Sequence, residues 1–304
     1  MRPDPFTSRL RESGPLILDG ATGTELERLG VAPDPPLWSS RAIFESPELV
    51  EKVHTDHARA GADVVITNTF RCGPRALSKA GLEDQGAKLV SSAVALARRT
   101  DAIVGVSVAP AEDCYQPESV PGPEELEREH QKLADWIAEA SPDLVWIETM
   151  NTAREAEAAA RAASERGLPF AVNFVLSEEN TLLSGEPISA GFDAVCGIGA
   201  GPTCIGINCI PPKGATRALP RLLELADGRI PVSIYAHVGN PKPVPGWSFA
   251  QVMQSDEYAE AAGTWVTMGA QVVGGCCGTT AEYIRAICAV LERDQVRKDP
   301  RWKP

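Results

Sequence analysis

The sequence lacks several patterns that would place it in common classes of protein. No apolar run approaches the ~20 residues that span a bilayer. No Gly-x-Gly-x-x-Gly follows the first predicted strand, and there is no Gly-Lys-Ser/Thr phosphate loop. Positive charge is also scarce, with 29 Lys and Arg against 41 Asp and Glu and a net charge of −12. Because nucleic acids and anionic membranes bind clustered cations, we expect neither as a partner.

A signal peptide is also missing from the polar start of the chain, residues 1–13. This predicts a cytoplasmic protein, in which the eight cysteines are reduced, buried or metal-bound and not cross-linked. The absence of a Cys-x-x-Cys run argues against a redox role for the adjacent pair Cys276 and Cys277. We expect one domain over residues 1–304, with flexible ends at 1–13 and 294–304.

Short apolar or β-branched segments alternate with helical stretches along nearly the whole chain. Such alternation predicts a parallel sheet covered by helices. Eight units fit a closed (β/α)8 barrel better than an open sheet, which usually has five or six strands. The predicted strands lie at 15–21, 63–70, 102–108, 144–149, 169–176, 204–209, 231–237 and in the run from 272. The predicted fold is therefore a single α/β barrel.

Residues able to do chemistry lie where these strands end, which is where active sites of such barrels are built. Cys276 and Cys277 are adjacent, so they form a poor disulfide, and the glycines around them allow the backbone to turn. Cys209 ends the sixth strand and is brought to them only by the fold. Three thiolates with one open position form a catalytic zinc layout that suits a thiol substrate. The other strand ends carry Asp19, Asn68, Thr69, Glu148 and His237.

Each candidate also has a simpler interpretation. Asp19 could form a turn with Gly20, and Glu148 could cap or pair locally. A lone cysteine is usually a small buried hydrophobe, which we expect for Cys72, Cys196, Cys204 and Cys288. Cys114 is either a loop thiol or part of a site wall. The histidines His54, His57 and His130 lie in predicted helices and are expected to be surface or packing residues.

Six runs resemble the homocysteine S-methyltransferase family, in the family's order and over nearly the whole chain. The pairing of Asn-Cys with Gly-Gly-Cys-Cys-Gly-Thr is the most specific part of this resemblance. The matching runs are 18–26 (LDGATGTEL), 37–39 (LWS), 60–63 (AGAD) with 67–69 (TNT), 148–150 (ETM), 206–209 (GINC) and 274–279 (GGCCGT).

The resemblance implies a zinc-dependent enzyme that methylates homocysteine to give methionine. Cys209, Cys276 and Cys277 correspond to the family's zinc ligands. Asp19 and Glu148 correspond to the acids that hold the amino group of homocysteine, which suits the attraction of carboxylates for an ammonium. The backbone near Gly20 corresponds to the part that meets its carboxylate. Asn68 and Thr69 are expected to line the same substrate site.

The expected methyl donor is a sulfonium, most simply S-methylmethionine. Betaine, S-adenosylmethionine, methyl-folate or another thiol acceptor remain alternatives, as does a barrel that binds zinc or thiols without catalysis. Where many family members have a Tyr-Pro-Asn-like run, this chain has Tyr-Ala-His ending at His237. Its imidazole either closes the fourth zinc position, contacts the substrate, or is hydrogen-bonded beside the pocket. The loop 111–123 is a candidate wall on the donor side.

Overall fold

The computed structural model describes residues 4–241, 247–248 and 252–293, and its core is one sheet of eight parallel strands. Strand order is β1-β10-β7-β6-β5-β4-β3-β2. A parallel bridge between Leu18 and Val64 joins the two outer strands, so the sheet closes on itself. The predicted (β/α)8 barrel is therefore confirmed. The strands are β1 (Leu16–Ile17), β2 (Val64–Ile66), β3 (Ile103–Val108), β4 (Leu144–Met150), β5 (Phe170–Phe174), β6 (Cys204–Asn208), β7 (Val232–Ala236) and β10 (Val272–Gly275).

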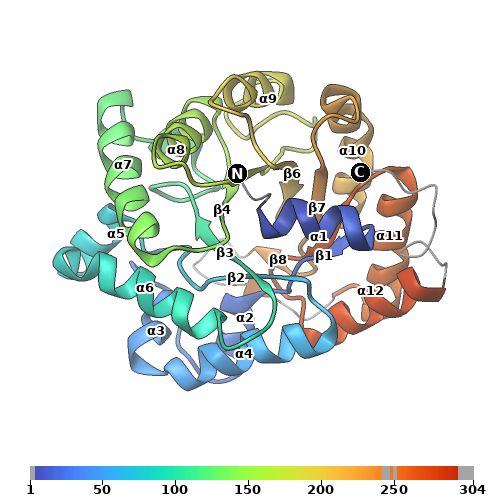
Figure 1. The fold of residues 1–304 in the computed structure, drawn as a ribbon, viewed down its shortest axis with the longest axis horizontal. Helices are drawn as coiled ribbons and strands as arrows, with labels where there is room; N and C mark the ends of the chain where they lie inside the picture. The colour runs from blue at the N-terminus through green and yellow to red at the C-terminus, as the bar shows by residue number, and fades with distance from the viewer. Residues whose placement is uncertain (1–3, 242–246, 249–251, 294–304) are drawn as a thin grey trace.

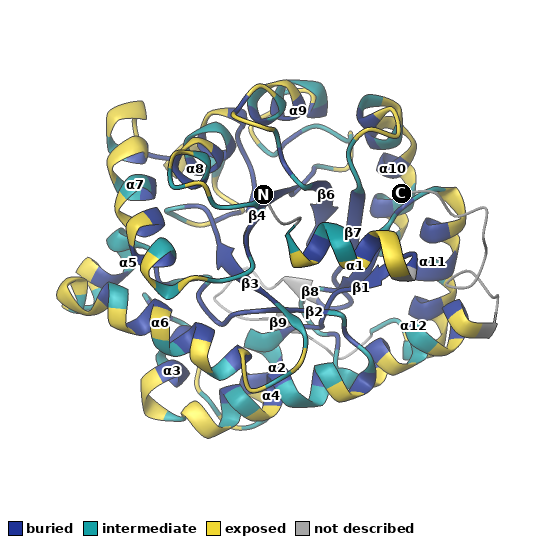
Figure 2. Cartoon of the chain, viewed as in Figure 1, coloured by how far each residue is buried: buried dark blue, intermediate teal, exposed yellow. Residues whose placement is uncertain are grey.

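Helices surround this barrel on its outside (Figure 1). They turn buried faces toward the strands and exposed faces outward, as the dark blue and yellow sides of the ribbons show (Figure 2). The helices are α1 (Pro5–Ser13), α2 (Thr22–Arg28), α3 (Ala42–Glu45), α4 (Pro47–Ala60), α5 (Pro74–Lys79), α6 (Gly86–Ala97), α7 (Pro123–Ala140), α8 (Ala153–Glu165), α9 (Ile188–Cys196), α10 (Pro212–Ala226), α11 (Ser255–Met268) and α12 (Ala281–Arg293). Three 3-10 turns, η1 (Ser39–Arg41), η2 (Glu83–Gln85) and η3 (Pro117–Ser119), and a short antiparallel pair, β8 (Asn240–Pro241) with β9 (Trp247–Ser248), lie in the loops.

Local sequence signals explain where several of these helices begin and end. The side chain of Thr152 accepts a hydrogen bond from the Glu155 backbone amide and starts α8. Gly61 ends α4 with φ at 110°, a left-handed conformation that glycine adopts without the strain of a side chain. Within the described residues, no helix has the length and apolar character needed to cross a membrane.

The start of the chain differs from its predicted flexibility. Residues 5–13 form α1, and Phe6 and Leu10 are buried in the cluster that fills the inside of the barrel. Phe6 meets the ring of Trp146 edge-on at 6.1 Å between centroids. Helix α1 lies across the middle of the ring of helices (Figure 1). Its two apolar side chains, four residues apart, lie on one face of the helix, and their burial explains why this segment is ordered. The predicted flexible end at 294–304 lies outside the described residues.

His54 and His57 on α4 are fully buried packing residues, and their burial disfavours the protonated rings. Neither ring nitrogen of His54 has a hydrogen-bond partner among the described residues. Burial lowers the pKa of His54 to about 3, with the charge of His57 adding to the effect, and lowers that of His57 to about 4. Both rings are therefore neutral in the folded protein at pH 7.

We expect His54→Leu to flatten the dependence of stability on acid pH. The folded-state pKa of His54 is depressed below its unfolded value of about 6.5, so the unfolded chain binds the extra proton as pH falls below that value. From about pH 6 to pH 4 this extra proton binding lowers the free energy of unfolding by about 1.4 kcal/mol for each pH unit of acidification. The variant lacks this contribution of His54. Urea denaturation across this range measures it. Exposed Arg59 on the same helix supplies the control, Arg59→Ala. Equal slopes for His54→Leu and the wild type would contradict the prediction.

Candidate active site

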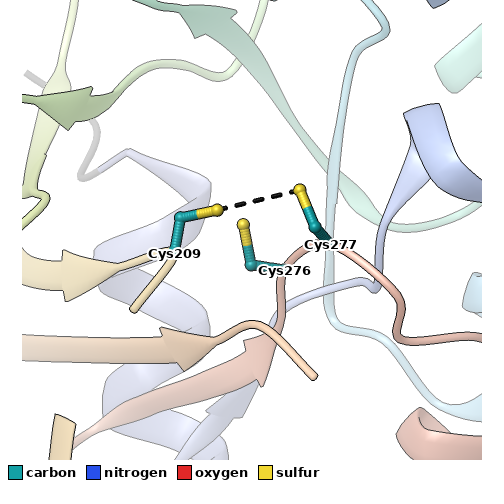
Figure 3. Close-up of side chains that lie close together, drawn as sticks. All are labelled: Cys209, Cys276 and Cys277. Carbon is teal, nitrogen blue, oxygen red and sulfur yellow. Dashed lines mark hydrogen bonds between the residues drawn. The ribbon is translucent and has the colours of Figure 1, made fainter. Parts of the chain in front are cut away.

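Three cysteine sulfurs meet at the carboxyl ends of the strands (Figure 3). Cys209 follows β6, and Cys276 and Cys277 follow β10, with β7 between these strands in the sheet. The three Sγ atoms all lie within 4.8 Å of one another, and those of Cys209 and Cys277 are 3.7 Å apart. Two sulfurs bound about 2.3 Å from one tetrahedral ion would be roughly 3.8 Å apart. The trio is therefore spaced to hold a metal such as zinc.

The backbone conformation around this cluster brings the strand ends that carry the three thiols close together. Cys209 has φ at 52°, a left-handed conformation that costs energy for a residue with a side chain. After β10 the chain turns at once, because the Thr279 amide donates to the Cys276 carbonyl at 3.1 Å. A Cβ added to Gly274 would lie 2.7 Å from the Leu18 carbonyl oxygen. Glycine there lets β10 pack against β1 and so positions the two thiols.

The three thiols share their protons unevenly. Hydrogen bonds from Cys276 and Cys277 hold the pKa of the Cys209 thiol well below its usual range. The same contact with Cys209 raises the pKa of both Cys276 and Cys277. Because ligand thiols must be deprotonated, a bound cation would displace the remaining protons.

Two acidic side chains lie at the same end of the barrel. Asp19 is buried and accepts a hydrogen bond from the Ile66 amide at 2.8 Å. Half-buried Glu148 accepts from the Ser107 hydroxyl at 2.6 Å and from the Tyr235 hydroxyl at 3.2 Å. Burial raises the pKa of Asp19 above its usual value, and the charge of Glu148 adds to this. Burial also raises the pKa of Glu148 to about 7. A cation placed between them would stabilise both carboxylates.

The other predicted substrate residues lie at the same strand ends, but the side chains of Asn68 and Thr69 hydrogen-bond to the backbone of neighbouring segments. The Asn68 amide donates to the Ser39 carbonyl at 2.7 Å, and the Thr69 hydroxyl donates to the Ser107 carbonyl at 2.8 Å. A Cβ added to Gly20 would lie 2.9 Å from His57 Nε2, so only glycine fits there without a shift. Contact of these three residues with a substrate stays a prediction.

His237 follows β7 and is buried beside the thiol cluster. A positive charge on its ring would lower the pKa of Cys209, so the two side chains lie near each other. The group of side chains close enough to share one ion, among the described residues, contains the three cysteines and not His237. Its role as fourth ligand or substrate contact therefore stays a prediction.

Sequence reasoning missed Tyr115. It lies in the loop between β3 and α7, and its hydroxyl donates to Cys209 Sγ at 3.4 Å and to the Cys209 carbonyl at 3.3 Å. Cys114 beside it is buried, and it lies close enough to the cluster for the charge of Cys209 to add to burial in raising the pKa of its thiol. The only signal in the sequence is that this loop follows a strand end.

Comparisons with known proteins agree with this arrangement. The homocysteine S-methyltransferase family model matches residues 16–291. Homocysteine S-methyltransferase 3 of Zea mays is 27% identical over 92% of this chain and 91% of its own. Homocysteine S-methyltransferase YbgG of Bacillus subtilis is 28% identical over 90% of this chain and 93% of its own.

A solved structure is similar over the full fold. The metallated form of the homocysteine methyltransferase MmuM from Escherichia coli matches with a TM-score of 0.80 at 29% identity, covering 94% of this chain and 99% of that one. The family model spans most of the chain, including both strand ends that carry the thiols. This chain belongs to the homocysteine S-methyltransferase family.

Proposed function

We propose that this protein transfers a methyl group from a sulfonium donor, most simply S-methylmethionine, to the thiol of homocysteine, and that it uses zinc to do so. One observation carries the proposal: the three-sulfur cluster, buried Asp19 and half-buried Glu148 lie at the same end of one barrel. A thiol-binding centre and an ammonium-binding centre match the two ends of homocysteine. Family membership supports the methyl transfer itself.

In the proposed mechanism, Cys209, Cys276 and Cys277 hold the metal. Zinc bound there would supply Lewis acidity that keeps an acceptor thiol deprotonated at neutral pH. Three soft thiolate ligands suit zinc, and the similar metallated structure supports a metal in this family.

Asp19 and Glu148 orient the acceptor by pairing with its ammonium group. The hydroxyls of Ser107 and Tyr235 donate hydrogen bonds to Glu148, so its carboxylate is already oriented when the ammonium binds. The acceptor thiol releases its proton to solvent before transfer. The acceptor sulfur then forms a bond to the methyl carbon while the carbon–sulfur bond of the donor breaks, and the electron pair remains on the departing sulfur. Because that product leaves neutral, the chain needs no general acid, and its contribution is alignment.

We expect zinc-loaded protein to make methionine from homocysteine with a sulfonium donor. The protein is incubated with homocysteine and, separately, with S-methylmethionine, S-adenosylmethionine, betaine or methyl-folate, and methionine is measured. Turnover with S-methylmethionine should exceed that with betaine or methyl-folate. Turnover only with one of the latter would overturn the donor assignment. Bound zinc with no turnover on any donor would favour a barrel that binds without catalysis.

All eight cysteines, which lie within the described residues, are free. This supports the proposed cytoplasmic location, where thiols stay reduced.

A further inference from the structure

The loop between β3 and α7 is fastened to the barrel at several separate points. The backbone amide of Ala111 donates to Glu155 Oε1 at 2.7 Å, and the Glu155 side chain is fully buried. The Asn151 amide donates to the Cys114 carbonyl at 3.0 Å. These contacts hold the loop from the side of α8 and the end of β4, next to the acceptor site.

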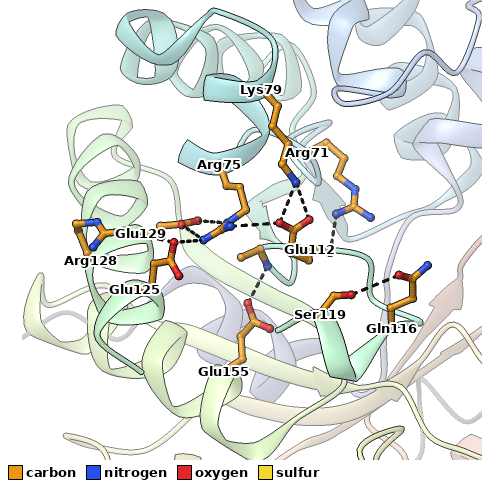
Figure 4. A network of polar contacts seen from close by, with 11 residues as sticks. Arg71, Arg75, Lys79, Glu112, Gln116, Ser119, Glu125, Arg128, Glu129 and Glu155 are labelled. Carbon is orange, nitrogen blue, oxygen red and sulfur yellow. Dashed lines mark hydrogen bonds and ion pairs between the residues drawn. The ribbon is translucent and has the colours of Figure 1, made fainter. Parts of the chain in front are cut away.

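A charged cluster holds the same loop from the opposite side (Figure 4). Arg71 donates to the Glu112 carbonyl at 2.7 Å. The carboxylate of Glu112 pairs with Lys79 at 2.8 Å and with Arg75 at 3.3 Å. Arg75 also pairs with Glu129 at 2.6 Å, which joins the loop to α7. Isolated exposed ion pairs contribute little, but several charges joined in one network can stabilise, so this network can hold the loop in place.

Tyr115 is the residue that this anchored loop presents to the thiol cluster. Its hydroxyl lies within hydrogen-bond distance of both the sulfur and the carbonyl oxygen of Cys209. Cys209 has a left-handed backbone, so it needs contacts that hold it in that conformation. The single proton of this hydroxyl is shared between the carbonyl oxygen and the sulfur, so one side chain contacts both the backbone and the thiol of Cys209.

We propose that Tyr115 is a positioning residue that clamps Cys209 in the geometry needed to bind metal, and that the Glu112 network presets this clamp. The inference rests on the proposed function only in taking Cys209 as a metal ligand. Groups that hydrogen-bond to metal ligands fix their orientation, and losing one typically costs 10- to 100-fold in metal affinity, by order of magnitude. Tyr115 acts through Cys209 and takes no part in bond making.

Tyr115→Phe tests the clamp, because it removes the hydroxyl and keeps the ring. Zinc affinity is measured by chelator competition without substrates, and the sulfur-to-cobalt charge-transfer band is recorded on Co2+-loaded protein. We expect Tyr115→Phe to bind zinc about 10-fold or more weakly and to alter the band. Glu112→Gln, which keeps the hydroxyl but weakens the anchor, should shift affinity in the same direction by a smaller factor.

Ser119→Ala is the matched control, because its hydroxyl is on the same loop and bonds only to Gln116 in the described structure. It should bind zinc like the wild type. Wild-type zinc affinity and an unchanged cobalt band in Tyr115→Phe would overturn the clamp, even if the wild type makes methionine. If the wild type makes no methionine but Tyr115→Phe still binds zinc more weakly, the proposed function fails and the clamp stands. A wild type that binds neither metal overturns both.

Discussion

Cys276→Ala is expected to lose both the bound metal and methyl transfer. The substitution removes one of three sulfurs that lie within 4.8 Å of one another. Four-ligand zinc sites bind with roughly 10–16 kcal/mol at pH 7, so one thiolate contributes about 2.5–4 kcal/mol, or roughly 100- to 1,000-fold in affinity. Zinc content after dialysis against a weak chelator and the rate of methionine formation measure the two losses, which should occur together.

Cys196→Ala is the control for this experiment. Cys196 is a free, half-buried cysteine at the end of α9 and does not belong to the cluster. Its loss should leave zinc content and activity unchanged. Full zinc stoichiometry in Cys276→Ala would contradict a site built from three thiolates.

Glu148→Gln is expected to raise the KM for homocysteine by roughly 10- to 100-fold. The amide keeps the size of the side chain and can still accept from Ser107, but it no longer pairs with an ammonium, and hydrogen bonds to charged groups are worth about 1.5–3 kcal/mol. The decisive comparison is with a thiol acceptor that lacks the amino group. The wild type should prefer homocysteine strongly, and the variant should lose most of that preference.

The pH dependence of the KM for homocysteine gives a second test of Glu148. Burial raises the pKa of Glu148 to about 7, so in the free protein it becomes protonated and neutral as pH falls through that value. The KM of the wild type should therefore rise from about pH 8 to pH 6, and that of Glu148→Gln should rise less. Glu157→Gln, a half-buried acid on α8 paired with Arg161, is the control. Unchanged acceptor preference in Glu148→Gln would rule out its role in binding the ammonium.

Much of the barrel could be predicted because its signals are local. Most strand residues are apolar or β-branched and buried on both faces, such as the fully buried 64–65 of β2. Helices begin at caps such as Thr152 and end at glycines such as Gly61. The start of the chain was missed because the two apolar residues of α1, Phe6 and Leu10, are few among polar neighbours, and their burial depends on the barrel being present.

The sequence by itself determined the chemistry available to this protein: three thiols and two acids at strand ends of a (β/α)8 barrel. Cysteine and carboxylate positions are local facts, and the strand that precedes each one sets the end of the barrel on which it lies. Tertiary structure decided which groups meet. Cys209 reaches Cys276 because β6 and β10 flank β7, and Tyr115 reaches Cys209 because a charged network holds its loop. Neither contact has a local signal, since each joins segments far apart in the chain through register and packing.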